Sequence, residues 1–449
     1  MRVMRQPVAL PEAAPDALAA SRALALRIAA RIRADGGWIG FDTYMGMALY
    51  EPGLGYYAGG SRKFGAAGDF VTAPELSDLF GRCLARQCAQ WFADCAHRVV
   101  EFGAGSGALA VQVLDELATL GFPETEYLIV EVSGELAARQ RERIARDCPQ
   151  ALGRVRWLTA WPATIDGVLL ANELLDAMPV RAFLRASAGA EAVADVEPAG
   201  NARAACADLE PAGNTRAACV DVDAVAPVFE RGVGLRASPS ADGDPVFEWS
   251  LRPAPAPFAR QVRERLAQGF GAAPTDPAAY AGEIGEQAEA WVAQAAQRLV
   301  RGAMLLIDYG FARREFFHAQ RAMGTLMCHY RHHAHGDPFH LPGLQDITAH
   351  VDFTAVAQAA TAAGLQLLGH VSQARLLTSL GLLEDLAQRH RSAGADPDPL
   401  AWARQAQAAQ ALLSEAEMGE LFKAVAFGRG ITGPADGFAR GDRSAELLE

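Results

Sequence analysis

Short apolar runs alternate with amphipathic helical patterns through the middle of the chain. Four such runs come first, at residues 99–102, 127–132, 155–158 and 167–171. Helical periodicity fills residues 108–120 and 135–147 between them. Three later runs follow, at residues 304–307, 365–371 and 421–427. Because apolar runs that alternate with helices are typical of βαβ units, the pattern predicts an α/β protein with a Rossmann-like, mostly parallel sheet of seven strands.

The chain before this alternation carries one clear helical pattern and one irregular segment. The helical pattern ends near Arg33, shortly before two consecutive glycines that are a common helix stop. Residues 38–75 are rich in glycine and aromatic side chains and match neither a clean helix nor a clean strand. A long ordered segment of this kind is usually a lid or a binding loop. A further helix is predicted over residues 76–92.

The alternation is interrupted after about Arg185. Residues 197–209 and 210–222 form a near-perfect tandem repeat of thirteen residues, and two copies are too few for a solenoid. Beyond the repeat, the pattern predicts a hairpin over 227–250 and helices near 255–268 and 283–300. We therefore expect four segments: an N-terminal extension that contributes to the site (1–95), a first part of the core (96–186), an inserted α+β region (187–300) and the remainder of the core with helical insertions (301–449).

Composition and charge exclude several classes of protein. The chain has 449 residues, of which 51% are hydrophobic, and its formal net charge is -12. An acidic surface repels phosphate backbones, so nucleic acid is not expected as a partner, and a cationic protein is electrostatically easier. No apolar run is long enough to span a bilayer, and seven cysteines without a Cys-x-x-Cys pair predict free thiols. We expect a cytoplasmic location in a bacterium, or the mitochondrial matrix in a eukaryote.

The clearest local motif follows the first predicted strand and reads Glu101-Phe102-Gly103-Ala104-Gly105-Ser106-Gly107. Glycines allow a tight turn and let the backbone approach a ligand, and the helix that follows offers unpaired N–H groups. Such a loop suits a nucleoside or a pyrophosphate. Alone, it is also compatible with a dinucleotide, because Gly103, Gly105 and Ala108 satisfy that fingerprint, and with a turn that binds no ligand.

Two acids near this loop favour S-adenosylmethionine as the cofactor. Glu101 lies two residues before the first glycine, where it would repel a pyrophosphate but attract the ammonium and sulfonium of S-adenosylmethionine. Glu131 ends the second predicted strand and can accept hydrogen bonds from both ribose hydroxyls, although NAD enzymes use the same device. The cofactor site that we expect comprises Glu101, Gly103, Ala104, Gly105, Gly107 and Glu131, together with Thr72 and Glu75.

The segment that follows the fourth predicted strand carries the predicted catalytic residues Asn172, Glu173 and Asp176. In an open parallel sheet, ligands lie beyond the carboxyl ends of the strands, near the switch in strand order. There Glu173, with Asp176, would hold and orient a methyl acceptor, and carboxylates can grip a guanidinium bidentately. The alternative is that Asn172 caps a helix and both acids face solvent.

Two further acidic clusters have a structural as well as a functional interpretation. Asp69, Thr72 and Glu75 lie in the irregular stretch, where Thr72 and Glu75 could form a helix capping box instead of lining the site. Glu283 is either a substrate contact or an acid in the first turn of a helix.

His350 and Asp352 are candidates for binding the substrate, because they lie in a predicted turn before a helix. Six of the ten histidines lie within residues 329–350, so metal binding has to be considered. The segment has neither an HExxH motif nor a cysteine partner at zinc-finger spacing, and Gly336-Asp337-Pro338 is typical of a loop. We therefore predict no metal site.

Taken together, these motifs resemble the MidA-like family of class I methyltransferases, which includes the mitochondrial arginine methyltransferase that assists assembly of respiratory complex I. The stretches that carry the resemblance are TYMGMALYEPGLGYY (43–57), GDFVTAPELSDLFGRCLARQ (68–87), VEFGAGSGALA (100–110), YLIVEVSGELAARQ (127–140), LLANELLDAMPV (169–180), LLIDYGF (305–311), GTLMCHYRHH (324–333) and DITAHVDF (346–353). The resemblance implies a Rossmann-like core, S-adenosylmethionine as cofactor and a protein arginine as acceptor, with a respiratory-complex subunit or similar protein as substrate. The tandem repeat departs from the family pattern.

Three functions remain open at this point. The leading one is transfer of a methyl group to an accessible arginine of a protein. The second is an assembly chaperone that binds the cofactor but acts mainly by holding a partner. The third is a dinucleotide-dependent oxidoreductase. The sequence also leaves a homodimer open.

Overall fold

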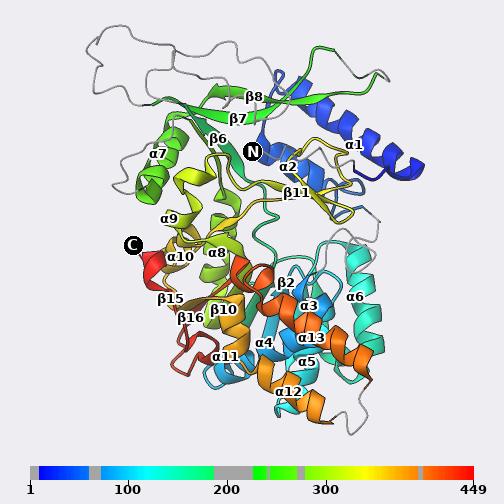
Figure 1. The fold of residues 1–449 in the computed structure, drawn as a ribbon, viewed down its shortest axis with the longest axis vertical. Helices are drawn as coiled ribbons and strands as arrows, with labels where there is room; N and C mark the ends of the chain where they lie inside the picture. Colours follow the sequence, from blue (N-terminus) through cyan, green and yellow to red (C-terminus); the bar gives the residue numbers. More distant parts are fainter. Residues whose placement is uncertain are drawn as a thin grey trace.

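One sheet of seven strands runs through the lower half of the molecule (Figure 1). The computed structural model describes residues 10–59, 72–186, 226–238, 240, 243–270, 279–392 and 398–448. The strands of the sheet, in spatial order, are β4 (Val155–Leu158), β3 (Glu126–Val130), β2 (Arg98–Phe102), β5 (Ile165–Asn172), β10 (Leu299–Phe311), β16 (Phe422–Arg429) and β15 (Gln366–Ser372). Only β16 runs antiparallel to its neighbours in this series. The predicted α/β fold with a seven-stranded, mostly parallel sheet is confirmed.

Helices cover both faces of this core sheet because successive residues of its central strands are apolar and point to opposite faces. Val99 and Val168 point into one apolar cluster, and Val100 and Leu169 point into the other. The first face is covered by α4 (Asp78–Trp91), α5 (Ala108–Thr119), α6 (Gly134–Asp147), α11 (Gln373–Ser379), α12 (Leu382–Ser392) and α13 (Pro399–Leu413). The second face is covered by α8 (Glu286–Arg298), α10 (Phe353–Ala362) and α15 (Ala445–Leu448).

The strand order reverses between β2 and β5, which lie side by side although β3 and β4 separate them in sequence. Phe102 at the end of β2 is paired with Ala171 near the end of β5. A reversal of this kind opens a crevice beyond the carboxyl ends of the strands. The glycine loop after β2 and the acids after β5 therefore lie next to each other, as the sequence predicts.

A second layer, which we call the cap, lies above the core sheet (Figure 1). It consists of α1 (Pro15–Ala34), α2 (Phe41–Tyr50), α7 (Ala256–Phe270) and a sheet of β1 (Ile39–Gly40), β7 (Val228–Leu235), β6 (Arg181–Arg185) and β9 (Tyr280–Ile284), with β8 (Phe247–Pro253) paired to β7. The N-terminal extension and the insertion thus share one sheet, since β1 pairs with β7. β6 also belongs to the cap, although we expected residues 96–186 to be part of the core.

Several local predictions in the cap region are confirmed and others are wrong. The predicted hairpin is confirmed as β7 and β8, while its tip at 241–242 and the tandem repeat lie outside the described residues. Residues 38–75 were predicted to lack a clean helix, but ten of them form α2, whose side chains Tyr44 and Met45 are buried. The helix predicted near 283–300 begins at Glu286, and the residues before it form β9.

A small sheet of three strands lies between the cap and the core and contains part of the histidine-rich segment. Its strands are β12 (His333–His335), β11 (Met327–Tyr330) and β13 (Asp346–Thr348). Arg331 and His332, between β11 and β12, both have positive φ, as a tight two-residue hairpin turn requires. The remaining short elements are α3 (Ala73–Leu76), η1 (Pro149–Arg154), α9 (Arg313–Phe316), η2 (Ala319–Arg321), β14 (Val351–Asp352), α14 (Met418–Leu421) and η3 (Asp436–Phe438).

Two expectations from composition can be compared with the fold. Five cysteines lie in the described part of the chain, all of them buried and none in a disulfide, as predicted. None of the helices in the described ranges has the length and apolar character that a bilayer span requires.

Candidate functional site

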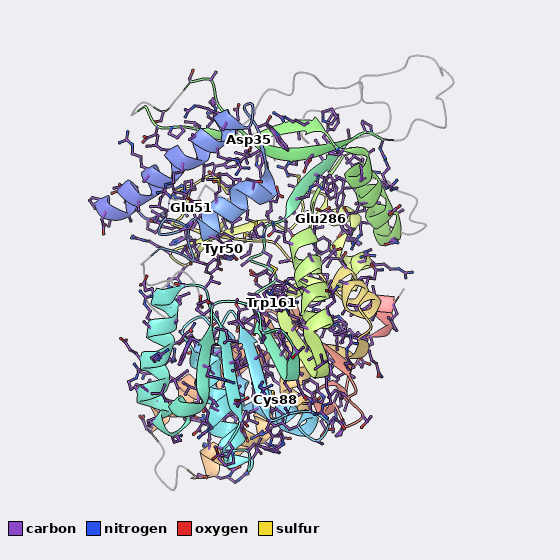
Figure 2. All side chains as sticks on the ribbon, turned by 180° about the vertical axis from the view of Figure 1, so that it is seen from behind. Asp35, Tyr50, Glu51, Cys88, Trp161 and Glu286 are labelled. Carbon is purple, nitrogen blue, oxygen red and sulfur yellow. The ribbon has the colours of Figure 1, made fainter. Side chains whose placement is uncertain are left out.

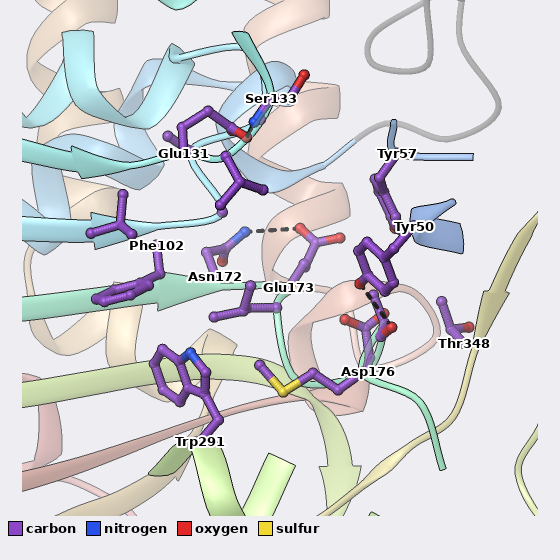
Figure 3. Close-up of a pocket in the computed structure, with 18 of the residues that line it drawn as sticks. Tyr50, Tyr57, Phe102, Glu131, Ser133, Asn172, Glu173, Asp176, Trp291 and Thr348 are labelled. Carbon is purple, nitrogen blue, oxygen red and sulfur yellow. Dashed lines mark hydrogen bonds between the residues drawn. The ribbon is translucent and has the colours of Figure 1, made fainter. Parts of the chain in front are cut away.

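A cavity of about 2010 Å³ lies between the cap and the carboxyl ends of β2, β3, β4 and β5. Tyr50 at the end of α2 faces it from the cap, and Trp161, after β4, lies below it (Figure 2). A helix face of α8, with Trp291, forms a further wall (Figure 3). Pockets for one small ligand usually have a volume of roughly 300 to 1,000 Å³, so this cavity is larger than one such ligand needs. It can therefore hold a cofactor and part of a second substrate together.

The glycine loop between β2 and α5 requires its glycines. Gly103, Gly105 and Gly107 all have positive φ, at 69°, 51° and 81°. A Cβ on Gly103 would lie 3.0 Å from Cδ1 of Leu174. The loop lines the cavity and leads directly into the N-terminus of α5 at Ala108. The backbone can thus approach a ligand closely, and the first N–H groups of α5 are available to it.

Glu131, after β3, is tied to the glycine loop by the amide of Gln140. Its Oε1 accepts a hydrogen bond from the N–H of Ser133 at 2.8 Å, and its Oε2 accepts one from Nε2 of Gln140 at 3.1 Å. The same Nε2 donates to the carbonyl of Gly105 at 3.0 Å. Trp157 donates to the Gln140 oxygen at 2.9 Å and so orients the amide. Glu131 therefore has a defined place beside the loop, suited to a ribose.

Glu101 lines the same part of the cavity but is only 2% exposed. The O–H of Tyr127 donates a hydrogen bond to its Oε2 at 2.8 Å. Burial raises the pKa of Glu101 to about 7, although the hydrogen bond from Tyr127 acts in the opposite direction. A buried carboxyl of this kind becomes ionised when a cation lies beside it.

Thr72 and Glu75 do not form the capping box that was one interpretation of the sequence. Thr72 precedes α3 without a side-chain hydrogen bond to it, and it lines the cavity. Glu75 lies behind the glycine loop, where it accepts a hydrogen bond from Ser106 and forms an ion pair with Arg143 at 2.5 Å. Glu75 thus braces the loop and does not line the cavity. Asp69 lies outside the described residues.

The predicted catalytic residues lie together, with Asn172 at the end of β5 and Glu173 and Asp176 in the turn that follows (Figure 3). No helix begins at Asn172, so the alternative interpretation that Asn172 caps a helix is wrong. The side-chain Nδ2 of Asn172 instead donates a hydrogen bond to Oε1 of Glu173 at 3.0 Å. Burial, with Asp176 nearby, raises the pKa of Glu173 to about 8. Burial also raises the pKa of Asp176 to about 6, opposed by a hydrogen bond from the O–H of Tyr309.

Sequence reasoning missed three residues on the opposite wall of this region. The O–H of Tyr57 lies 3.0 Å from both carboxylate oxygens of Asp346, which is 2% exposed. The ring of Tyr50 is stacked on that of Tyr57, with centroids 5.5 Å apart. All three line the cavity. Their stretches carry the family resemblance, but nothing in the local sequence separates Asp346 from other acids.

The lining of the cavity is strongly acidic. Among the residues that the structure describes, seven acids and neither a lysine nor an arginine line it: Asp42, Glu101, Glu131, Glu135, Glu173, Asp176 and Asp346. In the described part of the chain, Oδ1 of Asp176 and Oδ1 of Asn172 are buried without a hydrogen-bond partner. Buried acceptors without donors are costly, so this arrangement suits a ligand that brings positive charge and N–H groups.

Of the three other residues predicted to bind the substrate, His350 lines the cavity, whereas Glu283 and Asp352 do not. His350 lines the cavity, and burial lowers the pKa of its imidazole to about 4, so the ring is neutral. Glu283 lies on β9 outside the lining, and its Oε2 accepts from the backbone N–H of Thr325 at 2.8 Å. It is therefore not a helix first-turn acid.

Asp352 also lies outside the cavity lining and serves the fold. Its Oδ1 caps α10 by accepting from the N–H of Ala355 at 3.1 Å. Its Oδ2 forms ion pairs with Arg265 and Arg313, each at 3.1 Å. Because these partners already neutralise the carboxylate, we withdraw Asp352 from the predicted site.

Comparison with known proteins identifies the family. The model of the family described as "Putative S-adenosyl-L-methionine-dependent methyltransferase" matches residues 83–371, which is more than half of the chain. The chain belongs to this methyltransferase family. This confirms the family resemblance that the sequence motifs carry.

Solved structures agree with this assignment. One is the crystal structure of a superfamily member from Burkholderia thailandensis, described as a "likely methyl transferase" bound to S-adenosyl-homocysteine. Its sequence is 44% identical to this chain, and the two structures match with a TM-score of 0.80. The match covers 97% of this chain and 100% of that one. A native crystal structure of a protein from the same organism is 45% identical, with a TM-score of 0.78 over the same shares. The cofactor of this methyltransferase is S-adenosylmethionine. The residues present fit it, because the glycine loop has three positive φ values that favour glycine and let the backbone approach the cofactor, and Glu101 and Glu131 match its cationic and ribose groups.

More distant relatives carry a more specific name. The mitochondrial protein arginine methyltransferase NDUFAF7 of Danio rerio is 26% identical over 90% of this chain and 86% of its own length. The protein of the same name from Mus musculus is 25% identical over 76% of this chain and 70% of its own length.

Proposed function

We propose that this methyltransferase transfers a methyl group to an arginine nitrogen of a protein. The observation that carries the proposal is the acidic part of the cavity, which Glu173, Asp176 and Asp346 line with neither lysine nor arginine in the described lining. The names of the distant relatives support the same acceptor. A respiratory-complex subunit, which the sequence resemblance implies, is the first acceptor to test.

A guanidinium satisfies this part of the cavity better than a neutral acceptor does. Burial raises the pKa values of Glu173 and Asp176, and the charge of Asp176 raises that of Glu173 further, so ionising both in the empty site is costly. A cation between them removes that cost. The planar fork of a guanidinium presents several N–H donors to carboxylates at once, which a lysine ammonium cannot do in the same way.

The residues of the chain would act by positioning, charge localisation and proton acceptance. The bound cofactor supplies a methyl group made electrophilic by the sulfonium. Glu173 would hold the attacking nitrogen, and Asp176, oriented by Tyr309, would hold a second nitrogen of the same guanidinium. Carboxylates on one side of the guanidinium localise its positive charge near them and so leave a lone pair available on the attacking nitrogen.

The proton that this nitrogen loses when the new N–C bond forms needs an acceptor. Glu173 is suited to take it, because burial raises the pKa of its carboxyl to about 8. From there the proton can pass to solvent as the product leaves. The methyl–sulfur bond breaks as the N–C bond forms, so the two products are a methylated arginine and S-adenosyl-homocysteine, and both must leave before the next turnover.

The test is a comparison of arginine methylation in cells with and without the gene, by mass spectrometry of the whole proteome. We expect at least one arginine site to lose its methyl group and to regain it when the purified protein and labelled S-adenosylmethionine are added to the extract. Glu173→Gln should fail to restore it, whereas Glu142→Gln, a change of an exposed acid on α6, should restore it. Label found on a lysine or on a small molecule would refute the proposed acceptor.

A further inference from the structure

The end of β10 holds the turn that carries Glu173 and Asp176. The carbonyl of Ile307 accepts a hydrogen bond from the backbone N–H of Glu173 at 2.9 Å. Two residues later, the O–H of Tyr309 donates to Oδ2 of Asp176. Asp308 lies between these two contacts on the same strand. Three consecutive residues of β10 thus face one turn that is more than 130 residues earlier in the sequence.

Of these three residues, Asp308 makes the most hydrogen bonds to the turn. Its carboxylate is 1% exposed, and its Oδ2 accepts hydrogen bonds from the backbone N–H groups of Leu174, Leu175 and Asp176, at 3.1, 2.8 and 3.3 Å. Its Oδ1 accepts one from the N–H of Tyr309 at 2.9 Å. Burial, with Asp176 nearby, raises the pKa of Asp308, while the backbone donors oppose that shift.

The turn needs such an acceptor because its backbone has no regular partner. Residues 173–178 form neither a helix nor a strand, so the three N–H groups find no intra-element acceptor. In addition, Glu173 has φ of 51°, a left-handed conformation that costs a residue with a Cβ on the order of 1 kcal/mol or more. Successive N–H groups that converge on one carboxyl oxygen offset this cost and select one conformation of the turn.

We propose that Asp308 is a positioning residue of the methyl-transfer site. It does not line the described cavity; it acts through three backbone N–H groups that set the places of Glu173 and Asp176. Tyr309 completes the arrangement by orienting the Asp176 carboxylate. The inference rests on the proposed function of this turn in holding the methyl acceptor.

The test compares Asp308→Asn with the wild type in methyl transfer and cofactor binding. The asparagine has one oxygen in place of two and carries N–H groups of its own, so it cannot accept the same set of donors. Transfer from labelled S-adenosylmethionine into protein extract of cells lacking the gene is measured over a range of cofactor concentrations. We expect the apparent kcat to fall roughly 10- to 100-fold, because a misplacement of about 1 Å has that effect. The KM for S-adenosylmethionine and the Kd for S-adenosyl-homocysteine should stay within about twofold, which a general loss of structure would not allow.

Two further variants keep the test decisive. Asp94→Asn is the matched control, because Asp94 also accepts hydrogen bonds from backbone N–H groups, those of Thr432 and Gly433, and none of the three residues lines the cavity. It should leave transfer unchanged. Tyr309→Phe removes one O–H and keeps the carboxylate, so it should fold and lower kcat alone even if Asp308→Asn proves unstable.

Amide hydrogen exchange separates this inference from the proposed function. In the wild type the N–H groups of residues 174–176 should be protected, and Asp308→Asn should remove that protection while the glycine loop keeps its own. Unchanged protection, or full transfer by Asp308→Asn, would overturn the inference. If label enters a group other than arginine, the proposed acceptor is wrong. The loss of methyl transfer and of amide protection at residues 174–176 in Asp308→Asn would still decide the role of Asp308.

Discussion

The buried carboxyl of Glu101 makes the affinity for S-adenosylmethionine depend on pH near neutrality. Burial raises its pKa to about 7 in the protein without ligand. The cofactor brings an ammonium and a sulfonium to the cavity that Glu101 lines, and both favour the ionised carboxylate. Binding should therefore release a proton from Glu101 wherever the free site is still protonated. It follows that affinity falls as the pH decreases through the pKa of the free protein.

The size of the effect follows from this pKa. With a value of about 7, the free site is roughly nine-tenths ionised at pH 8 and one-tenth ionised at pH 6. If only the ionised site binds well, the Kd for S-adenosylmethionine rises about tenfold between these pH values, which is about 1.4 kcal/mol. In Glu101→Gln the charge is absent at every pH. That variant should bind weakly and show no slope.

Titration calorimetry in two buffers of different ionisation enthalpy measures both the Kd and the number of protons released. At pH 7 we expect about half a proton per cofactor in the wild type and none in Glu101→Gln. Glu126→Gln is the control, because Glu126 begins β3 and pairs with Arg98 and Arg156 outside the cavity lining. A flat pH profile in the wild type would refute the reasoning. A slope that persists in Glu101→Gln but disappears in Glu131→Gln would assign the proton to Glu131.

Three other predictions concern catalysis, the loop and stability. Glu173→Gln should lose methyl transfer and keep its affinity for the cofactor. It should also unfold at a higher temperature than the wild type at pH 9 but not at pH 5. The reason is that the pKa of Glu173 is about 8 in the folded protein, so the stability of the wild type falls as the pH rises from 4.5 toward 8. Differential scanning calorimetry at both pH values checks this, and equal melting temperatures at pH 9 would contradict it. Gly103→Ala should weaken cofactor binding roughly tenfold in calorimetry, because its φ is 69° and its Cβ would press on Leu174, so the loop must move. Arg86→Met should cost about 1 kcal/mol in urea unfolding, because it removes one of the two arginines that pair with the buried Glu116 while Arg82 remains; an unchanged midpoint would exclude that role.

The core and the cofactor loop could be predicted from sequence because their signals are local. Apolar runs of strand length and helical periodicity each occupy about ten residues, and the seven strands of the core sheet were found in this way. The glycine loop is equally local, since three positive φ values within five residues demand glycine. The acids of the turn 172–176 were found because strand order places the end of β5 beside the end of β2.

Local signals failed where a contact joins distant parts of the chain. α2 was missed because its stability comes from burial of Tyr44 and Met45 in the cap and not from a clean amphipathic pattern. Asp346 and Asp352 are six residues apart and look alike in sequence. Only the fold shows that Asp346 faces Tyr57 in the cavity, whereas Asp352 is neutralised by two arginines.

The sequence by itself therefore determined the cofactor of this methyltransferase and the loop expected to bind it, whereas only the tertiary structure brings together the residues that we propose for the acceptor. The cofactor half is formed by a continuous loop and strand ends whose order follows from the βαβ pattern. The proposed acceptor half consists of the turn after β5, the end of β10, the cap and β13, which are up to about 290 residues apart. The role of Asp308 depends on backbone N–H groups that every residue carries, so no choice of side chain in the turn could reveal it.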